Sequence, residues 1–566
     1  MLAEHPTARL LPLEIQFLCA TLEPCPGPRH QERLLALGRE IRDWPELFTR
    51  AQEHRVLSPL VQIMKTVEIP DLPTLWQEYV ETELANRTYE SLVLTQELAR
   101  LAKCFEERGA AVVPYKGPLL AILCGKSVSS RQYENLDTLV RESDWDATVG
   151  ILREGGYRAL YEFDSADHDE KKRTEEDSYR RGDISVTVRL QAVEMLPHVP
   201  RRLEWEDLTK RLVQVSVGGT PVRTISREDC VSLIAAQATR HCWSRLQWTL
   251  DVARLVASPE FDWAMALERA RQMGVERMVL LGLGLVESLL QTVLPEEVAG
   301  RIARDPGLRK LQEFVLDVIA QGGHAEAGAG WARRAAFRVR SFDSVSDGLR
   351  HAVRRAAGAD GSRRVRERIP ATTPWRWLAL IKAVVRGRRL RPRKDLGGFL
   401  PTPEPVVEKL LELAAPRPGD VLYDLGCGDG RVVVAAAKRY GIRCVGVDLD
   451  SQLLAGAKER ARREGVEHLV RLIRQDAKTV DVSEATILHL FVATLGNALL
   501  RPYLEEHLKP GTRIVSANAQ MLGWPPERRV VVADPGGAEW TLFLMRAGAP
   551  QASEPPRTAS PACARS

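Results

Sequence analysis

The sequence predicts an α/β fold, with a doubly wound parallel sheet in its C-terminal part and a mostly helical α+β region before it. From Asp420, a β-rich run, a glycine loop, a helix, a second strand and a second helix follow one another. This order implies a parallel sheet with helices on its faces. Residues 45–65 and 228–257 repeat apolar side chains at i, i+3, i+4 and i+7, which is the helical period. Between them, residues 110–193 hold short β-leaning runs separated by helical ones, which is typical of an α+β domain.

Length and composition are those of a soluble globular protein with several domains. The chain has 566 residues, of which 44% are hydrophobic and 27% charged, and its net charge is +5. These values exclude a mainly disordered, collagen-like or disulfide-scaffold protein. Nine cysteines without a C-x-x-C pair argue against a zinc ribbon or a redox dithiol and fit a reducing compartment. Because the N-terminus lacks signal-peptide features and no apolar run reaches ~18 residues, we expect a cytoplasmic location.

Charge and composition divide the chain into four segments. Residues 331–394 hold 19 Lys+Arg against four acids, which marks a basic linker or helical extension of the first domain. We therefore predict a first domain over 1–330, the basic segment over 331–397 and a second domain over 398–548. The Pro-, Ala- and Ser-rich stretch 549–566 is predicted to be a disordered tail.

A glycine-rich loop, GCGDG at residues 426–430, directly follows the first strand of the second domain. Its glycines allow a sharp turn and a close approach of the backbone to a ligand, which binds such sheets outside the carboxyl ends of the strands. The spacing is G-x-G-x-G, whereas a dinucleotide fold would show G-x-G-x-x-G. Acids at Asp424 and Asp429 repel phosphate but suit the sulfonium and amino group of S-adenosylmethionine.

Two further aspartates end neighbouring strands. Asp448 ends the second strand, where its carboxylate can accept hydrogen bonds from both ribose hydroxyls. Asp476 ends a third strand, a position suited to the adenine amino group or nearby backbone. The sequence therefore predicts an S-adenosylmethionine site made of Asp424, Gly426, Cys427, Gly428, Gly430, Asp448 and Asp476.

Residues 399–546 resemble the small class I S-adenosylmethionine-dependent methyltransferases, which have a Rossmann-like sheet. The nearest group in pattern includes the lysine methyltransferases of the ATP synthase c subunit and of the adenine nucleotide translocase. The family's Pro-Thr-Pro motif stands at 401–403 and its cofactor loop at 424–430. The resemblance implies S-adenosylmethionine as cofactor and methyl transfer to a protein lysine or a small-molecule acceptor.

The acceptor side of this domain is less defined by the sequence. Thr402, Asn497 and Trp524 are candidates for the acceptor pocket, although a Trp beside two prolines also fits simple packing. Residues 516–519 read Ser-Ala-Asn-Ala where the family tends to carry Ser-His-Asp-Phe, so this side departs from the family pattern. The absence of an Asn-Pro-Pro-Tyr motif argues against a DNA adenine acceptor. No catalytic residue is assigned, because methyl transfer needs in-line alignment more than a strong protein base.

Most of residues 10–392 resembles the bacterial nucleotidyltransferase-like family of the polymerase-β superfamily. The resemblance rests on Tyr115-Lys116-Gly117, on Arg131, on Leu136-Asp137 and on the late segment RHCWSRLQWTLDVARL. It implies an α+β domain in which carboxylates on neighbouring strands hold Mg²⁺ for nucleotidyl transfer.

The carboxylates that this chemistry requires are incomplete, which predicts a degenerate site formed by Lys116, Gly117, Asn135, Asp137 and Arg189. The family's Asp-x-Asp is here Asn135-Leu-Asp137, and an arginine stands where an acid is expected on the later strand. An amide adds no charge for a hard dication and an arginine repels it, so bound Mg²⁺ is not expected. A shifted register that uses Glu134 or Asp183 is the alternative.

The basic segment allows three interpretations. Residues 374–394 could form an amphipathic helix on an anionic membrane surface, or pack their apolar face on the first domain. Nucleic-acid binding is a third option, but the clustered aromatics give no strong signal for it.

For the whole chain, we predict an S-adenosylmethionine-dependent methyltransferase, with protein lysine as one acceptor, fused to a nucleotidyltransferase-like domain. The alternative is a nucleotidyltransferase acting on a sugar or small-molecule acceptor, with an accessory methyltransferase domain. A scaffold with two degenerate domains is a third hypothesis, against which the intact glycine loop and Asp448 argue.

Overall fold

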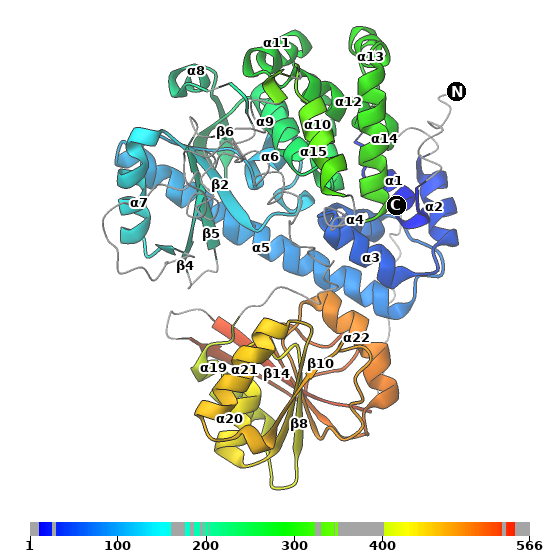
Figure 1. Cartoon of the computed structure of the whole chain (residues 1–566), viewed down its shortest axis with the longest axis vertical. Helices are drawn as coiled ribbons and strands as arrows, with labels where there is room; N and C mark the ends of the chain where they lie inside the picture. Colours follow the sequence, from blue (N-terminus) through cyan, green and yellow to red (C-terminus); the bar gives the residue numbers. More distant parts are fainter. Residues whose placement is uncertain are drawn as a thin grey trace, which may run out of the picture. The chain divides into compact units, whose positions relative to one another are not determined.

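The computed structural model in Figure 1 describes residues 11–24, 30–159, 176–181, 186–192, 196, 199–201, 203–322, 330–344, 346–348, 401–534 and 539–548. The chain divides into two units. Unit 1 is formed by Met1–Leu72 and Val80–Arg393, and unit 2 by Lys394–Ser566 with Pro73–Tyr79. The amphipathic segment 374–394, the tail 549–566 and Asp183 lie outside the described residues.

Helices make up most of unit 1, in agreement with the apolar periodicity. Several begin at a side chain whose oxygen accepts a backbone N–H of the first turn, as at Asp43, Ser226 and Asp262. No helix among the described residues is both long and apolar enough to span a membrane. Apart from residues 74–79 of α5, which belong to unit 2, the helices of unit 1 are α1 Leu13–Thr21, α2 His30–Glu40, α3 Trp44–Glu53, α4 Leu57–Thr66, α5 Thr74–Glu107, α6 Pro118–Leu123, α7 Trp145–Glu154, α8 Trp205–Thr209, α9 Arg227–Arg240, α10 Leu246–Val256, α11 Trp263–Met273, α12 Glu276–Leu290, α13 Glu296–Ala303, α14 Pro306–Ala320 and α15 Trp331–Arg340.

A five-stranded sheet of order β1-β2-β5-β4-β3 lies among these helices, and β2 and β5 pair in parallel. Its strands are β1 Val112–Pro114, β2 Asn135–Val140, β3 Arg158–Ala159, β4 Glu176–Arg181 and β5 Val186–Ala192, and a separate hairpin joins β6 Val213–Val217 to β7 Thr220–Thr224. Leu98 and Phe105 of α5 and Leu152 of α7 share one buried cluster with Leu136 and Val188 of the sheet. The packing therefore fixes the sheet against α5 and α7.

Unit 2 is the predicted doubly wound sheet. Seven strands lie in the order β10-β9-β8-β11-β12-β14-β13, all parallel to their neighbours except for the antiparallel pairs that β14 makes. The strands are β8 Val421–Leu425, β9 Arg443–Asp448, β10 Val470–Arg474, β11 Ile487–Leu490, β12 Arg513–Ala517, β13 Arg528–Ala533 and β14 Glu539–Arg546. The helices are α19 Glu404–Ala414, α20 Arg431–Tyr440, α21 Ser451–Arg463 and α22 Thr494–His507.

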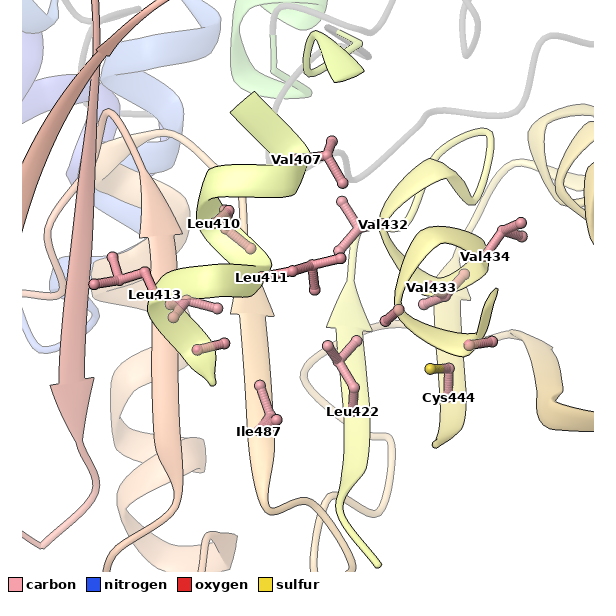
Figure 2. Packing of buried hydrophobic residues seen from close by; sticks show 14 of the residues in the cluster. Val407, Leu410, Leu411, Leu413, Leu422, Val432, Val433, Val434, Cys444 and Ile487 are labelled. Carbon is pink, nitrogen blue, oxygen red and sulfur yellow. The ribbon is translucent and has the colours of Figure 1, made fainter. Parts of the chain in front are cut away.

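Alternate residues of the central strands pack on opposite faces of this sheet. Leu422 and Ile487 join the apolar residues of α19 and α20, a cluster that Figure 2 shows at close range. Tyr423 and Leu488 point the other way and share a cluster with Leu500 of α22. Because the central strands are buried on both faces, a ligand can reach their residues only at the strand ends.

Candidate functional site

The glycine loop follows β8 and leads into α20. Gly426, Gly428 and Gly430 have φ angles of 91°, 53° and 74°, a region that residues with a Cβ rarely adopt. A Cβ on Gly430 would also lie 2.6 Å from the Cβ of Ala457 on α21. Glycines are therefore needed here for two reasons: the positive φ angles of the loop and the close contact with α21.

Backbone hydrogen bonds tie this loop to the end of β9. The amides of Gly426 and Cys427 both donate to the carbonyl of Val447, at 2.8 and 3.0 Å. The Gly428 amide donates to Asp448 Oδ2 at 2.9 Å, and the Asp450 amide donates to Asp448 Oδ1 at 2.8 Å. Each carboxylate oxygen of Asp448 thus keeps further acceptor capacity while the backbone fixes its orientation.

The negative charge that the sequence offers to a sulfonium at Asp429 is paired with two arginines of the protein. The Asp429 carboxylate accepts from Arg431 Nε and Nη2 at 2.9 and 2.7 Å and from Arg460 Nη2 at 2.8 Å. Partial burial raises the pKa of Asp429, but the hydrogen bonds and charge of the two arginines outweigh it and hold this pKa below the ordinary 3.8. The acid therefore fastens the loop to α20 and α21.

Asp424 also has a protein partner, which the sequence did not indicate. It lies opposite His489 in the parallel pairing of β8 with β11, and Asp424 Oδ1 is 2.7 Å from His489 Nδ1. Both residues are only 2% exposed, and His489 Nε2 has no hydrogen-bond partner among the described residues. The Asp424 carboxylate is thus a buried, His-paired group beneath the loop.

Cys427 contributes its backbone rather than a reactive sulfur. Burial raises the pKa of its thiol far above the ordinary value, and the Asp424 and Asp448 charges raise it further. A Cβ on Gly446 of β9 would lie 2.9 Å from Cys427 Sγ, so the thiol fills the space that this glycine leaves.

Asp476 lies just beyond the carboxyl end of β10, the strand beside β9. Its Oδ1 accepts from the Lys478 amide at 3.0 Å, which shapes a short turn. Because β8, β9 and β10 are parallel neighbours, the glycine loop, Asp448 and Asp476 all lie at one edge of the sheet.

The structure links Thr402 to this edge. Arg431 Nη1 donates to the Thr402 carbonyl at 2.5 Å while the same guanidinium binds Asp429, so residues 401–403 are fastened to the glycine loop. The sequence analysis did not select Arg431 as a site residue. Its position directly after the glycine loop is the one sequence feature that could have indicated this role.

Asn497 and Trp524 are buried, at 0% and 4% exposure. Asn497 Nδ2 donates to the carbonyls of Ala519 and Gln520 at 3.2 and 3.5 Å, so it connects α22 to the segment after β12. Asn497 Oδ1 has no partner among the described residues. Trp524 belongs to the apolar cluster that α22 forms with the sheet, as its packing alternative would require.

In unit 1, the register of β2 and β5 places Asp137 opposite Arg189. Arg189 Nη1 lies 3.2 Å from Asp137 Oδ1. In the amide orientation that satisfies both polar atoms of Asn135, its oxygen accepts from Arg189 Nη2 at 2.9 Å. One guanidinium therefore contacts both strand residues that would hold a divalent cation, and these residues do not fit a magnesium site.

Lys116 lies beside this pair and is 8% exposed. Its Nζ donates to Tyr115 Oη at 2.8 Å and to Gln237 Oε1. The next residue, Gly117, has φ 61° and ψ −128°, and a Cβ there would lie 3.3 Å from the Asn135 carbonyl. The Lys-Gly pair therefore lets the chain turn tightly against the start of β2.

Comparison with known proteins identifies unit 2. Residues 424–528 match the family model described as the ANTKMT methyltransferase domain. A protein-lysine N-methyltransferase of Saccharolobus islandicus is 39% identical over 147 residues, which cover 26% of this chain and 91% of that protein. The chain belongs, through unit 2, to this methyltransferase family. The domain is an S-adenosylmethionine-dependent methyltransferase, as the glycine loop and strand-end aspartates predicted.

Other relatives of the methyltransferase domain are matched over different shares of their own length. The Mus musculus adenine nucleotide translocase lysine N-methyltransferase is 35% identical over 121 residues, or 21% of this chain and 52% of that protein. The chain thus spans about half the length of that relative. The crystal structure of an RNA methyltransferase from Salinibacter ruber with S-adenosyl-L-homocysteine is 41% identical and covers 27% of this chain and 98% of that one, with a TM-score of 0.25.

Residues 40–291 match the model of a family described as uncharacterised nucleotidyltransferase. The methyltransferase domain is thus fused to a nucleotidyltransferase-like domain, as predicted. Among the described residues, no group of three or more His, Cys, Asp or Glu side chains is arranged to hold a metal ion.

Proposed function

We propose that the chain is a protein-lysine N-methyltransferase whose methyltransferase domain spans residues 398–548. The observation that supports it most is the 39% identity to a protein-lysine N-methyltransferase over 91% of that relative's length. The mouse relative, also a lysine N-methyltransferase, points to the same class of acceptor.

We assign the cofactor contacts to the edge where β8, β9 and β10 end. Asp448 would accept from the ribose hydroxyls, because both of its oxygens keep acceptor capacity beside their backbone amides. Gly426, Gly428 and Gly430 would let the loop approach the cofactor closely, and Asp476 would lie near the adenine. When bound, S-adenosylmethionine supplies an electrophilic methyl group on its sulfonium.

The acceptor amine has to reach that methyl group as a neutral nucleophile. Its nitrogen forms the new N–C bond while the C–S bond breaks, the electron pair stays on sulfur, and the amine proton passes to solvent. Asn497 would hold the segment after β12 in place, and Thr402 would border the pocket through its link to Arg431. Alignment by these fixed elements supplies the rate enhancement that a strong base would otherwise provide.

The proposal is tested by incubating the full chain with tritium-labelled S-adenosylmethionine and a cell extract, then digesting with protease or ribonuclease. We expect label that protease releases and ribonuclease leaves in place, and much less of it with Asp448→Ala. Label that ribonuclease removes would overturn the protein acceptor while leaving the methyltransferase assignment intact.

A further inference from the structure

A polar pocket of about 130 Å³ lies in the nucleotidyltransferase-like domain, where β2 and β5 meet α9 and α10. This volume is well below the roughly 300 Å³ at which drug-sized ligand sites begin. The pocket therefore suits a small ion or one end of a larger molecule.

The charge that lines this pocket is net positive. Its cations are Arg55, Lys116, Arg131, Arg189 and Arg245, and its carboxylates are Glu134, Asp137 and Asp251. Five cations against three carboxylates leave an excess of two positive charges. A site built for divalent cations would need the opposite sign.

Each of the three carboxylates is held by an arginine. Arg131 binds Asp251 through two bonds of 2.8 and 2.9 Å, and both side chains are buried. Arg189 contacts Asp137 at 3.2 Å, and Arg55 contacts Glu134 at the rim. The acids therefore orient the arginines rather than offering open oxygen ligands to a metal.

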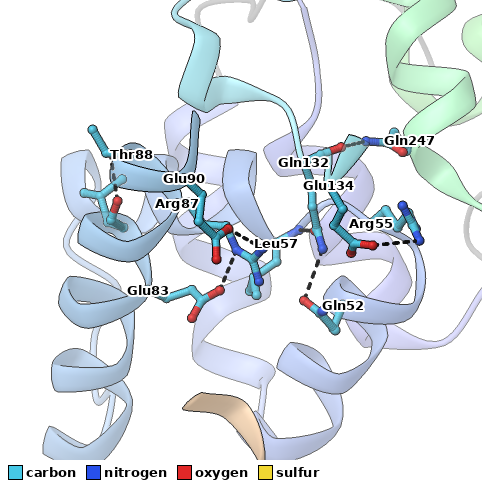
Figure 3. Close-up of polar contacts among 11 residues, drawn as sticks. Gln52, Arg55, Leu57, Glu83, Arg87, Thr88, Glu90, Gln132, Glu134 and Gln247 are labelled. Carbon is cyan, nitrogen blue, oxygen red and sulfur yellow. Dashed lines mark hydrogen bonds and ion pairs between the residues drawn. The ribbon is translucent and has the colours of Figure 1, made fainter. Parts of the chain in front are cut away.

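The rim of the pocket is also preorganised. Figure 3 shows Arg55 Nη2 approaching Glu134 Oε2, a distance of 3.5 Å, and Gln132 between Gln52 and Gln247. Gln132 Nε2 donates to Gln52 Oε1 at 3.3 Å, and Gln247 Nε2 donates to the Gln132 carbonyl. On the other side, the Arg245 guanidinium lies 5.5 Å from the centroid of the Trp248 ring.

We infer that this pocket binds the phosphoryl group of a small phosphorylated molecule without a divalent cation. A phosphate monoester carries about −1.5 to −2 charges at neutral pH, which balances the excess of two positive charges. The guanidinium and ammonium groups supply the charge-assisted donors that phosphate oxygens accept. The net positive charge of the pocket lining thereby takes over the neutralising role of a metal.

The test is equilibrium dialysis of labelled inorganic phosphate against the full chain in EDTA. We expect saturable binding that weakens as sodium chloride is raised and does not change when Mg²⁺ replaces EDTA. Lys116→Gln and Arg245→Gln should each weaken binding about tenfold or more, the loss expected for one charge-assisted contact. The matched control is Lys103→Gln, because that side chain on α5 is 70% exposed and lies outside the pocket, and it should leave phosphate binding unchanged.

Three results would overturn the inference: binding that requires Mg²⁺, no binding by the folded wild-type chain, or equal affinity in wild type and Arg245→Gln. Since Lys116 is buried, circular dichroism accompanies each measurement, and the partly exposed Arg245 supplies the decisive variant if Lys116→Gln unfolds. Asp448→Ala should leave phosphate binding intact, which separates this site from the methyltransferase domain.

Discussion

Replacing Asp448 with alanine tests the cofactor site most sharply. The change removes the acceptor of two backbone bonds, from Gly428 at 2.9 Å and Asp450 at 2.8 Å, together with the carboxylate proposed to bind the ribose. A hydrogen bond to a charged group contributes about 1.5–3 kcal/mol, so affinity for S-adenosylhomocysteine should fall roughly 10- to 150-fold. Because the two amides lose their acceptor, the free energy of unfolding should fall as well, by about 1–3 kcal/mol.

Isothermal titration calorimetry of S-adenosylhomocysteine into the full chain measures the loss of affinity, with a melting curve for each variant. Glu459→Ala is the matched control, because Glu459 is a 71% exposed carboxylate on α21, the helix that follows Asp448. It should bind like the wild type. If folded Asp448→Ala also kept the wild-type affinity, the assignment of the β9 end to the ribose would be refuted.

Three further predictions follow from single contacts. The double variant Asn135→Asp, Arg189→Glu should bind ATP in a Mg²⁺-dependent manner, as measured by calorimetry. The wild type should release no pyrophosphate from nucleoside triphosphates. Failure of the double variant to gain Mg²⁺ dependence would contradict the placement of these residues. Asp429→Asn should lower the free energy of unfolding in urea near neutral pH, because a carboxyl whose pKa is lowered in the folded state stabilises the fold at pH values above its unfolded pKa. The difference from the wild type should shrink as the pH falls through and below 3.8, and a pH-independent difference would contradict this. Gly446→Ala should cost about 1–3 kcal/mol, because its Cβ would lie 2.9 Å from both Cys427 Sγ and Leu472 Cδ2. Cys427→Ala removes only the sulfur contact, so thermal melts should show a smaller cost in that background, and an equal cost in both backgrounds would contradict the contact with Cys427.

The sequence carried enough information to predict the local form of the sheet edge to which we assign the cofactor. The G-x-G-x-G spacing anticipates three residues of positive φ, and the position of Asp448 after a buried strand anticipates its place beside the loop. Both are short-range consequences of backbone sterics and of strands that end at one edge of a parallel sheet.

Side-chain partners across elements could not be predicted in the same way. Asp429 and Arg460 are 31 residues apart in sequence, and Asp424 and His489 are 65 apart. Their contacts depend on the helix packing and strand register that only the folded sheet defines. Without that register, the sequence does not distinguish an acid that binds the cofactor from an acid that pairs with another residue of the protein.

In unit 1, too, the side-chain partners across strands could not be predicted from the sequence. The alternation in β2 put Asn135 and Asp137 on one face, but the partner opposite Asp137 follows from the parallel register with β5. That register brings Arg189 into contact with both residues and changes the sign of the pocket. The strand positions that would hold metal-binding acids in a nucleotidyltransferase thus line a pocket with a net positive charge.

The most direct test of the central claim is the chemical identity of the methylated residue. The labelled acceptor from the tritium transfer reaction is hydrolysed completely, and the products are separated against methylated amino-acid and nucleoside standards. We predict that the label elutes as Nε-methylated lysine and that Asp448→Ala lowers its yield, whereas Glu459→Ala does not. Label in a methylated nucleoside, or in an amino acid other than lysine, would contradict the account.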